Sequence, residues 1–400
     1  MAHAVNPSFH VVLILFISLA SSFATGAVQY NVRSYGAKPD GKTDSTKAFL
    51  AAWTQACAST KSVTIYAPKG RFLLSKLAFQ GPCKNNATVL RIDGSLVAPS
   101  DYSVIGSSQN WISFEHVNGV KVSGGILDGQ GTGLWSCKAS GKSCPDGATS
   151  LGFANSKNIV ISGLTSLNSQ KIHILIDSCQ NVKVQGVKIM ASGKSPNTDG
   201  IHVQASTSVT ILNSKIGTGD DCVSISPGTS NMWVQNVACG PGHGISIGSL
   251  GKSLQEGGVQ NVTVTQTIFT GTSNGVRIKT WGRPSNGFAK NIIFEHLIMN
   301  NVQNPIVIDQ NYCPGHNNCP SQDSGVKISN VTYLDIHGSS GTKIAVKFDC
   351  SKKYPCNGIE LKDINLTYKN QPAEASCNNS SGACLQRESD KSLVLGFTGV

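Results

Sequence analysis

Three segments of this chain have nearly the same text: 158-NIVISGLTSLN-168, 181-NVKVQGVKIMA-191 and 208-SVTILNSKIGT-218. Each begins with Asn or Ser, alternates apolar with polar residues, and has Gly or Asn at its sixth position. Such alternation is typical of short β-strands with one buried face. From about residue 112 onward the pattern recurs in further segments, which start at residues 119, 231, 261, 291, 325 and 358. The chain therefore contains an internal repeat.

The period of the repeat indicates the fold. Starts from residue 158 to residue 291 are separated by 23, 27, 23, 30 and 30 residues, with no segment between them long enough for a crossover helix. Stacked coils of short strands bury their inward apolar residues in one continuous core, so we predict an all-β, single-domain, right-handed parallel β-helix. A sandwich or propeller is the alternative, but its repeats are usually closer to about 10 or about 40 residues. Thr43 or Asp44 can cap one helix over about 45–58, which we expect to cover the N-terminal end of the core.

The N-terminal segment has the features of a signal peptide. The apolar run VVLILFISLA at 11–20 is too short to span a membrane, and Ala-Thr-Gly before Ala27 offers a cleavage site. We expect residues 1–26 to be removed and residues 27–400 to form a secreted, extracellular domain without a membrane anchor. Secretion makes six Asn-X-Ser/Thr sequons available for glycosylation, at Asn86, Asn261, Asn330, Asn365, Asn378 and Asn379.

Composition narrows the class of partner. With 39% apolar and 14% charged residues, the chain is neither disordered nor a coiled coil. Its 33 basic and 22 acidic residues give a net charge of +11, which suits a polyanion. The basic residues are scattered singly and only 6% of residues are aromatic, so a nucleic-acid partner is disfavoured and an acidic polysaccharide fits at least as well.

Thirteen cysteines in a secreted chain favour disulfides over a metal, and no CxxC or HExxH motif argues for a metal site or a cofactor. Spacing favours six bridges and leaves Cys179 as a buried, inert thiol, although spacing alone does not fix the connectivity. The expected pairs are Cys57–Cys83, Cys137–Cys144, Cys222–Cys239, Cys313–Cys319, Cys350–Cys356 and Cys377–Cys384.

Chargeable residues recur at the period of one coil. They are Asp199, the pair Asp220 and Asp221, His243, Arg277 and Lys279. Residues one coil apart lie roughly 4.7–4.9 Å apart in a parallel stack, so we expect these side chains to crowd on one surface. Taken singly, an Asp beside Gly is usually a turn residue and a Lys or Arg is usually a solvated surface residue. A column of like charges lowers stability, however, and turn formation alone gives no reason for such a column, so a purely structural role for the whole set is disfavoured.

Two or three carboxylates in a cleft are the groups that glycoside hydrolysis needs. One carboxylic acid protonates the leaving oxygen, and another carboxylate activates water or attacks. Crowding is expected to raise the pKa of one of them, so that it remains protonated in mild acid. Neighbouring cations, which we take to be exposed, match a sugar that itself carries a carboxylate. The implied substrate is a polymer of uronic acid.

Four motifs, in this order, resemble glycoside hydrolase family 28, the polygalacturonases. They are NTD at 197–199, GDD at 219–221, GHG at 242–244 and RIK at 277–279. The resemblance extends from about Tyr30 through the C-terminal cysteines, and VIDQNYC places Tyr312 where the family keeps a substrate-contacting tyrosine. Residues 240–252 and 275–288 are similar to those of plant pollen exopolygalacturonases.

The resemblance implies a monomeric, inverting hydrolase of polygalacturonate, or pectin, in the cell wall, acting from the chain end and without a metal or other cofactor. The implied roles are Asp220 as general acid, Asp199 and Asp221 as the base pair that holds the attacking water, His243 as the residue that maintains the hydrogen bonding and protonation of the acid, and Arg277, Lys279, Tyr312 and Asn197 as galacturonate ligands. The alternatives are attack within the chain, a calcium-dependent pectate lyase, a rhamnogalacturonan hydrolase and a non-catalytic cell-wall protein.

Overall fold

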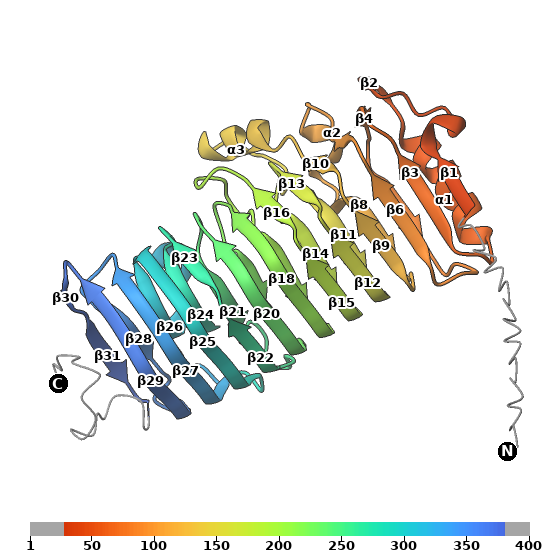
Figure 1. Cartoon of the computed structure of the whole chain (residues 1–400). Helices are drawn as coiled ribbons and strands as arrows, with labels where there is room; N and C mark the ends of the chain where they lie inside the picture. The colour runs from red at the N-terminus through yellow and green to blue at the C-terminus, as the bar shows by residue number, and fades with distance from the viewer. Residues whose placement is uncertain (1–27, 381–400) are drawn as a thin grey trace, which may run out of the picture.

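The molecule is a long coil of strands. A computed structural model describes residues 28–380, and Figure 1 shows their strands following one another along a single axis. The strands form one sheet of 20 and one of 11, and every pairing is parallel except that of β29 with the two-residue strand β30 near the C-terminal end. The predicted parallel β-helix is therefore confirmed.

The smaller sheet receives one strand from each coil after the first, in which helix α1 (Thr46–Ala58) follows β2 (Asp40–Asp44). Its members are β5 (Leu77–Gln80), β8 (Asn110–Glu115), β11 (Thr149–Ala154), β14 (Ile174–Asp177), β17 (Ile201–Gln204), β19 (Val223–Ile225), β21 (Ile245–Leu250), β24 (Asn274–Trp281), β26 (Asn304–Tyr312), β28 (Ile344–Asp349) and β31 (Glu374–Asn378).

The larger sheet contains the repeated text, and its first coil begins at Val28 rather than near residue 112. Its members are β1 (Val28–Asn31), β2 (Asp40–Asp44), β3 (Val63–Ala67), β4 (Arg71–Leu73), β6 (Thr88–Ile92), β7 (Ser95–Val97), β9 (Val120–Ser123), β10 (Ile126–Asp128), β12 (Lys157–Ser162), β13 (Thr165–Leu167), β15 (Gln180–Gln185), β16 (Lys188–Met190), β18 (Thr207–Gly217), β20 (Ser230–Cys239), β22 (Val259–Thr265), β23 (Ile268–Thr270), β25 (Phe288–Val302), β27 (Lys327–Ser340), β29 (Asn357–Tyr368) and β30 (Gln371–Pro372).

Helix α1 (Thr46–Ala58) covers the N-terminal end of the coil, as predicted. Its first turn is capped by Asp44, whose Oδ1 accepts a hydrogen bond from the Thr46 N–H at 2.8 Å. On its inner face the Trp53 ring lies 4.9 Å from that of Phe79, measured between centroids. The helix therefore closes the apolar core where no further coil is stacked on it.

Further short helices were not predicted. They are η1 (Val32–Tyr35), α2 (Ser103–Gly106), α3 (Thr132–Ala139) and η2 (Pro314–His316). In α3 only Leu134 and Trp135 are buried, so the segment is too short to show a helical apolar period. Among the helices of residues 28–380, none is long and apolar enough to cross a bilayer. The proposed signal peptide lies outside the described residues.

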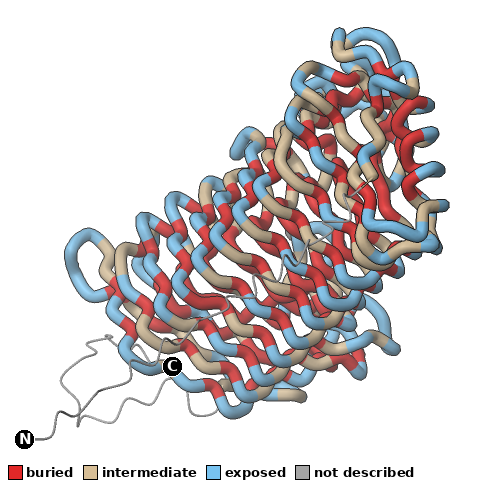
Figure 2. The backbone as a smooth tube through the Cα atoms, turned by 45° about the vertical axis from the view of Figure 1, so that its right-hand side comes forward, coloured by how far each residue is buried: buried red, intermediate tan, exposed pale blue. Residues whose placement is uncertain are grey.

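Alternation along the strands builds the core. In β15 the side chains of Val182 and Val184 are buried while Lys183 between them is exposed, and Figure 2 shows this alternation of buried and exposed positions along the whole coil. Like residues stack between coils, because the register is parallel: the rings of Phe114 and Phe153 lie 4.9 Å apart and 6° from parallel.

The corner that precedes the larger sheet is lined by asparagines. Asn158 and Asn181, at the starts of their repeats, have φ of 57°, the left-handed region that asparagine tolerates. Their side chains are also linked, because the Asn181 Nδ2 donates to the Asn158 Oδ1 at 2.7 Å. The same contact joins a second run further along, and we call both runs the asparagine ladder: Asn118, Asn158 and Asn181, then Asn231, Asn261, Asn291 and Asn330.

Five of the six expected disulfides are present: Cys57–Cys83, Cys137–Cys144, Cys222–Cys239, Cys313–Cys319 and Cys350–Cys356. Cys377 is also disulfide-bonded, and its expected partner Cys384 lies outside the described residues. Cys179 is a free, buried thiol, as predicted, and burial raises its pKa to about 11. It is therefore unreactive at neutral pH.

Candidate active site

The chargeable residues lie just before three successive strands of the smaller sheet. Asp199 precedes β17, Asp221 precedes β19 and His243 precedes β21, while Arg277 is on β24. Strand register aligns them, because His202 pairs with Ser224, Ser224 with Ser246, and Ser246 with Arg277. Neighbouring coils thus present their polar side chains on one outer face.

A cavity of about 550 Å³ opens on this face. All three aspartates contribute to its walls, and so do residues from the coils on either side. Among the residues that line it are Asn197, Asp199, Asp220, Asp221, Lys279 and Tyr312. His243 and Arg277 join the same group through hydrogen bonds to Asp220 and Asp221. The structure therefore brings together all eight residues that the sequence singled out.

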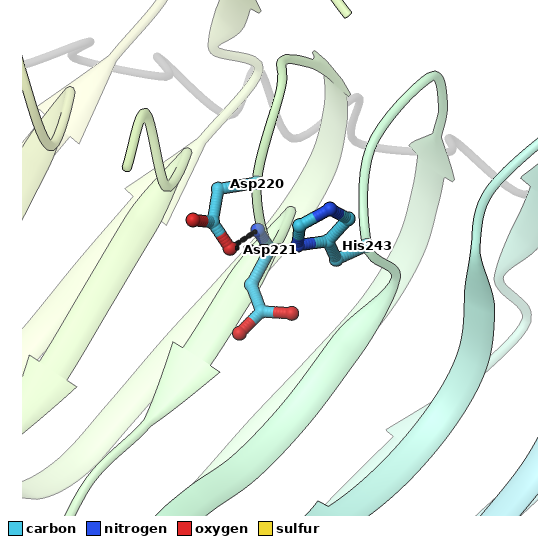
Figure 3. Close-up of side chains that lie close together, drawn as sticks. All are labelled: Asp220, Asp221 and His243. Carbon is cyan, nitrogen blue, oxygen red and sulfur yellow. Dashed lines mark hydrogen bonds and ion pairs between the residues drawn. The ribbon is translucent and has the colours of Figure 1, made fainter. Parts of the chain in front are cut away.

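Asp220 and His243 form an ion pair between adjacent coils (Figure 3). The His243 Nδ1 lies 3.0 Å from the Asp220 Oδ1, and the Asp221 backbone N–H donates to the same oxygen at 2.8 Å. The hydrogen bond to Asp220 raises the pKa of His243, and although burial lowers it, the nearby carboxylate charges add to the increase. A raised pKa of His243 beside a lowered pKa of Asp220 favours a proton on the imidazole over one on the carboxylate.

The expectation that crowding raises the pKa of a carboxylate is wrong for Asp220. Burial does raise its pKa, but the hydrogen bond and charge of His243, the Asp221 N–H and the charge of Lys279 together lower it below the ordinary value. Asp221 adds little repulsion, because its own charge is compensated by Arg277 and Lys279. Free Asp220 is therefore ionised.

Asp221 is buried with its counter-ions. Its Oδ1 accepts from Ser246 Oγ at 2.8 Å and from an Arg277 guanidinium nitrogen at 3.0 Å, and its Oδ2 accepts from Lys279 Nζ at 2.9 Å. Lys279 is 7% exposed and Asp221 only 1%, so the prediction of exposed cations was wrong for Lys279. Figure 3 shows the Asp221 carboxylate pointing away from that of Asp220.

Asp199 has a different environment. Its Oδ2 accepts a hydrogen bond from Ser224 Oγ at 2.5 Å, and its Oδ1 accepts none from the described residues. Its side chain is 15% exposed and faces the cavity. Asp199 therefore combines a free oxygen with access to solvent, and its one ionisable neighbour, His202, lies 3.7 Å away.

Tyr312 forms the far wall of the cavity beside the cations. Its ring centroid lies 5.3 Å from Lys279 Nζ and 5.9 Å from the Arg277 guanidinium carbon, and Trp281 packs against its ring edge to face. These contacts hold an aromatic face and two cations next to the carboxylates, an arrangement suited to an acidic sugar.

A family model described as glycosyl hydrolases family 28 matches residues 57–387. The chain belongs to this family. It is 65% identical over 92% of its length to a polygalacturonase of Prunus persica, of which it covers 94%, and 44% identical over 89% of its length to an exopolygalacturonase of Platanus acerifolia, of which it covers 95%. The solved endo-xylogalacturonan hydrolase of Aspergillus tubingensis superimposes with a TM-score of 0.79 at 25% identity, covering 89% of this chain and 97% of that one.

Family 28 membership, together with these relatives, makes the chain a glycosidase of the polygalacturonase type. The family motifs did not include three polar residues that this structure adds to the site: His202, Ser224 and Ser246. A signal for them exists in the sequence, since Ser224 and Ser246 each follow a motif residue, Asp221 or His243, by three positions. This constant offset places them one register step into the strand.

In this family 28 chain one group of side chains has spacing compatible with a cation. Within residues 28–380, Asp220, Asp221 and His243 each offer a ligand atom, and these atoms lie within 4.8 Å of one another. Both Asp221 oxygens already accept hydrogen bonds from cationic side chains, and the Asp220 Oδ1 accepts from His243. Ion pairs inside the protein therefore account for the charges of this cluster.

Proposed function

We propose that the chain hydrolyses the α-1,4-galacturonosyl linkages of polygalacturonate with inversion at the anomeric carbon. The proposal rests chiefly on one observation: Asp199 and Asp220, from neighbouring coils, face one cavity that also contains Lys279 and Tyr312. A carboxyl on each side of a glycosidic bond and a cation for the uronate carboxylate are the groups that this reaction needs.

In this proposal Asp220 is the general acid. Its Oδ1 lies 3.0 Å from the His243 Nδ1, so the carboxyl receives a proton from the imidazole through this contact and passes it to the leaving oxygen. Because Asp220 is ionised in the free enzyme, the proton carried by His243 has to move to Asp220 once bound substrate excludes water and brings its own negative charge. His243 thereby keeps the acid supplied with a proton.

Asp199, with Asp221, holds the attacking water on the opposite side of the bond. Asp221 already accepts hydrogen bonds on both oxygens, so the larger share of proton abstraction falls to the free oxygen of Asp199. Arg277 and Lys279, which are anchored by Asp221, bind the galacturonate carboxylate together with Tyr312 and Asn197.

Reducing-sugar release from polygalacturonate, with proton NMR of the first product, tests this function. Hydrolysis with initial β-galacturonic acid is the expected result. An initial α product would contradict the base role of Asp199, and cleavage that produces an unsaturated sugar and needs calcium would indicate a lyase. A chain that binds polygalacturonate without cleaving it would be the non-catalytic alternative.

Attack from the chain end is the mode that the likeness of residues 240–252 and 275–288 to exopolygalacturonases favours. A second mode, attack within the chain, is favoured by the cavities beside the site. One of about 370 Å³ shares His202 and Gln204 with the catalytic cavity, and one of about 600 Å³ on the other side shares Lys252 and Ser253.

Two cysteine-bearing loops, residues 131–149 and 312–323, contribute to the lining of these side cavities. Asp146 and Gly147 line the smaller one, and Cys319 and Pro320 the larger. Viscosity of polygalacturonate, followed against reducing ends released, separates the modes. Slow viscosity loss with monomer as the sole early product supports attack from the chain end, whereas a rapid fall with mixed oligomers supports attack within the chain.

We also propose that residues 1–26 are a signal peptide and that residues 27–400 are secreted as a monomer. The disulfides support this compartment, because such bonds persist in oxidising surroundings. N-terminal sequencing of protein from the medium should begin at Ala27, and light scattering should give the mass of one chain. Retention in the cell or a dimer mass would contradict the corresponding part.

A further inference from the structure

His202 stands beside the candidate base without touching it. It is on β17, three residues after Asp199, and its Nδ1 lies 3.7 Å from the Asp199 Oδ2, beyond hydrogen-bond distance. Between them lies the hydroxyl of Ser224 from the next coil, 2.7 Å from the His202 Nδ1 and 2.5 Å from the Asp199 Oδ2. Ser224 is buried, at 2% exposed, and it borders the cavity that Asp199 faces.

The direction of these hydrogen bonds follows from the chemistry of the groups. An ionised carboxylate only accepts, so the Ser224 hydroxyl has to donate its one proton to Asp199. The serine oxygen is then an acceptor towards His202, which places a proton on the His202 Nδ1. On the other side of the ring, the His202 Nε2 lies 3.3 Å from the side-chain oxygen of Gln204. A chain of donors therefore runs from His202 through Ser224 to Asp199.

The neighbouring coil repeats this arrangement with one difference. There Ser246 donates to Asp221 and accepts from the Arg277 Nε at 3.1 Å. Arg277 also contacts Asp221 directly, and Lys279 occupies the second oxygen. His202 makes no such direct contact with Asp199, so the serine bond fixes the carboxylate while its other oxygen remains free.

We propose that His202 is a positioning residue that acts through Ser224 on Asp199, a role that rests on the proposed hydrolase function. Donation from His202 holds the Ser224 hydroxyl oriented towards the Asp199 Oδ2. The Asp199 Oδ1 is then directed into the cavity, where it accepts the proton of the attacking water. Without the His202 donor the hydroxyl can rotate and the carboxylate loses its fixed orientation, which misplaces the base rather than removing it.

Two substitutions of His202 separate this role from bulk or substrate contact. His202→Asn keeps a donor at the Nδ1 position, whereas His202→Gln keeps one only near Nε2. We expect His202→Gln and Ser224→Ala each to lower kcat on polygalacturonate by roughly 10- to 100-fold, the scale for a misplaced catalytic group, with KM within about twofold. His202→Asn should recover most of the loss.

A double-mutant cycle tests whether the two residues act as one unit. Because Ser224 carries the effect of His202, the His202→Gln/Ser224→Ala double variant should be no slower than Ser224→Ala alone. His337→Gln, an exposed histidine on the larger sheet, serves as control and should retain parent activity. Unfolding temperatures of the site variants should stay near that of the parent.

Each other outcome counts against the proposal. Equal activities of His202→Asn and His202→Gln, additive losses in the double variant, or a rise in KM without a fall in kcat would overturn the positioning role while leaving the hydrolase intact. A folded parent without hydrolytic activity would instead overturn the proposed function, and the role of His202 with it.

Discussion

Two columns of polar side chains run along this coil, the asparagine ladder and the column of the candidate site. They differ in how the stacked groups satisfy their hydrogen bonds and charges. In the asparagine ladder each amide donates to the previous one, as Asn291 does to Asn261 at 3.1 Å. An amide is both donor and acceptor, so a stack of identical amides satisfies itself. In the site column the stacked groups are carboxylates, which only accept. Asp221 therefore needs Arg277 and Lys279, and Asp220 needs His243.

The comparison teaches which polar repeats carry function. A neutral ladder stabilises the corner where it lies and needs no compensating charges from neighbouring residues. A charged column costs desolvation and repulsion, and it persists only with compensating cations at neighbouring positions. If this distinction holds, changes in the site column should affect activity and changes in the ladder should affect stability alone.

Asp220→Asn is expected to give the largest loss of activity with the least change in stability. The amide has the shape of the acid but cannot donate the catalytic proton, so we expect activity on polygalacturonate to fall by about 10²–10⁴. The unfolding temperature should stay within a few degrees of the parent, because Asp220 lies outside the apolar core. Reducing-sugar assays and thermal melts check both parts, and activity within tenfold of the parent would remove Asp220 as the acid.

Lys279→Ala should lower both the activity on polygalacturonate and the stability of the fold, so at this position of the site column the two effects are not separated. Removing this cation leaves the buried Asp221 with an uncompensated oxygen, and breaking a buried ion pair usually costs about 3–5 kcal/mol. Denaturant unfolding measures the loss. The double variant Lys279→Met/Asp221→Asn is the matched control, since it should regain stability but no activity. Unchanged stability in Lys279→Ala would show that this pair contributes nothing to the fold.

The Asp220–His243 pair predicts a pH dependence. The raised pKa of His243 means that its stabilisation is complete below the unfolded value of 6.5 and is lost as pH rises through the folded pKa. The lowered pKa of Asp220 gives stabilisation above 3.8 that is lost as pH falls through its folded pKa. Activity should fall on the alkaline side as the pair loses its proton.

His243→Gln tests this dependence. It should move the alkaline limb of kcat/KM, and it should change the unfolding temperature only slightly, because the His243 side chain is 42% exposed. An unchanged alkaline limb would separate His243 from the proton supply of Asp220.

The sequence predicted the larger sheet better than the smaller one. Every repeat start found in the text lies in a strand of the larger sheet or within two residues of one, because strand alternation there accompanies a corner that favours Asn, Gly or a small polar residue. Strands of the smaller sheet bury both faces over much of their length: all residues of β19 are buried, and four of six in β8. Without alternation they lack a periodic signal.

In the site, too, some features could be predicted from the sequence and others could not. Motif residues such as Asp199 and Lys279 could be found because their types and order are distinctive. The ionisation of the carboxylates could not be predicted from the sequence. The pKa of Asp220, for example, depends on its contact with His243 and on whether Asp221 is already paired with cations. His202 and Ser224 were also missed, because a histidine and a serine on a strand have many ordinary roles until the register places them beside Asp199.

The smallest effect is expected in the asparagine ladder, where a substitution should lower stability without changing activity. Asn291 donates to Asn261 and accepts from Asn330 at 3.2 Å, and its φ of 56° lies in the left-handed region. Asn291→Gly loses both hydrogen bonds but tolerates this φ, so it should cost about 1 kcal/mol. Asn291→Ala adds the steric cost of the left-handed conformation, about 1 kcal/mol more. Both variants should hydrolyse polygalacturonate at the parent rate. Denaturant unfolding beside the reducing-sugar assay decides the matter, and a loss of activity at unchanged stability would show that the ladder is not purely structural.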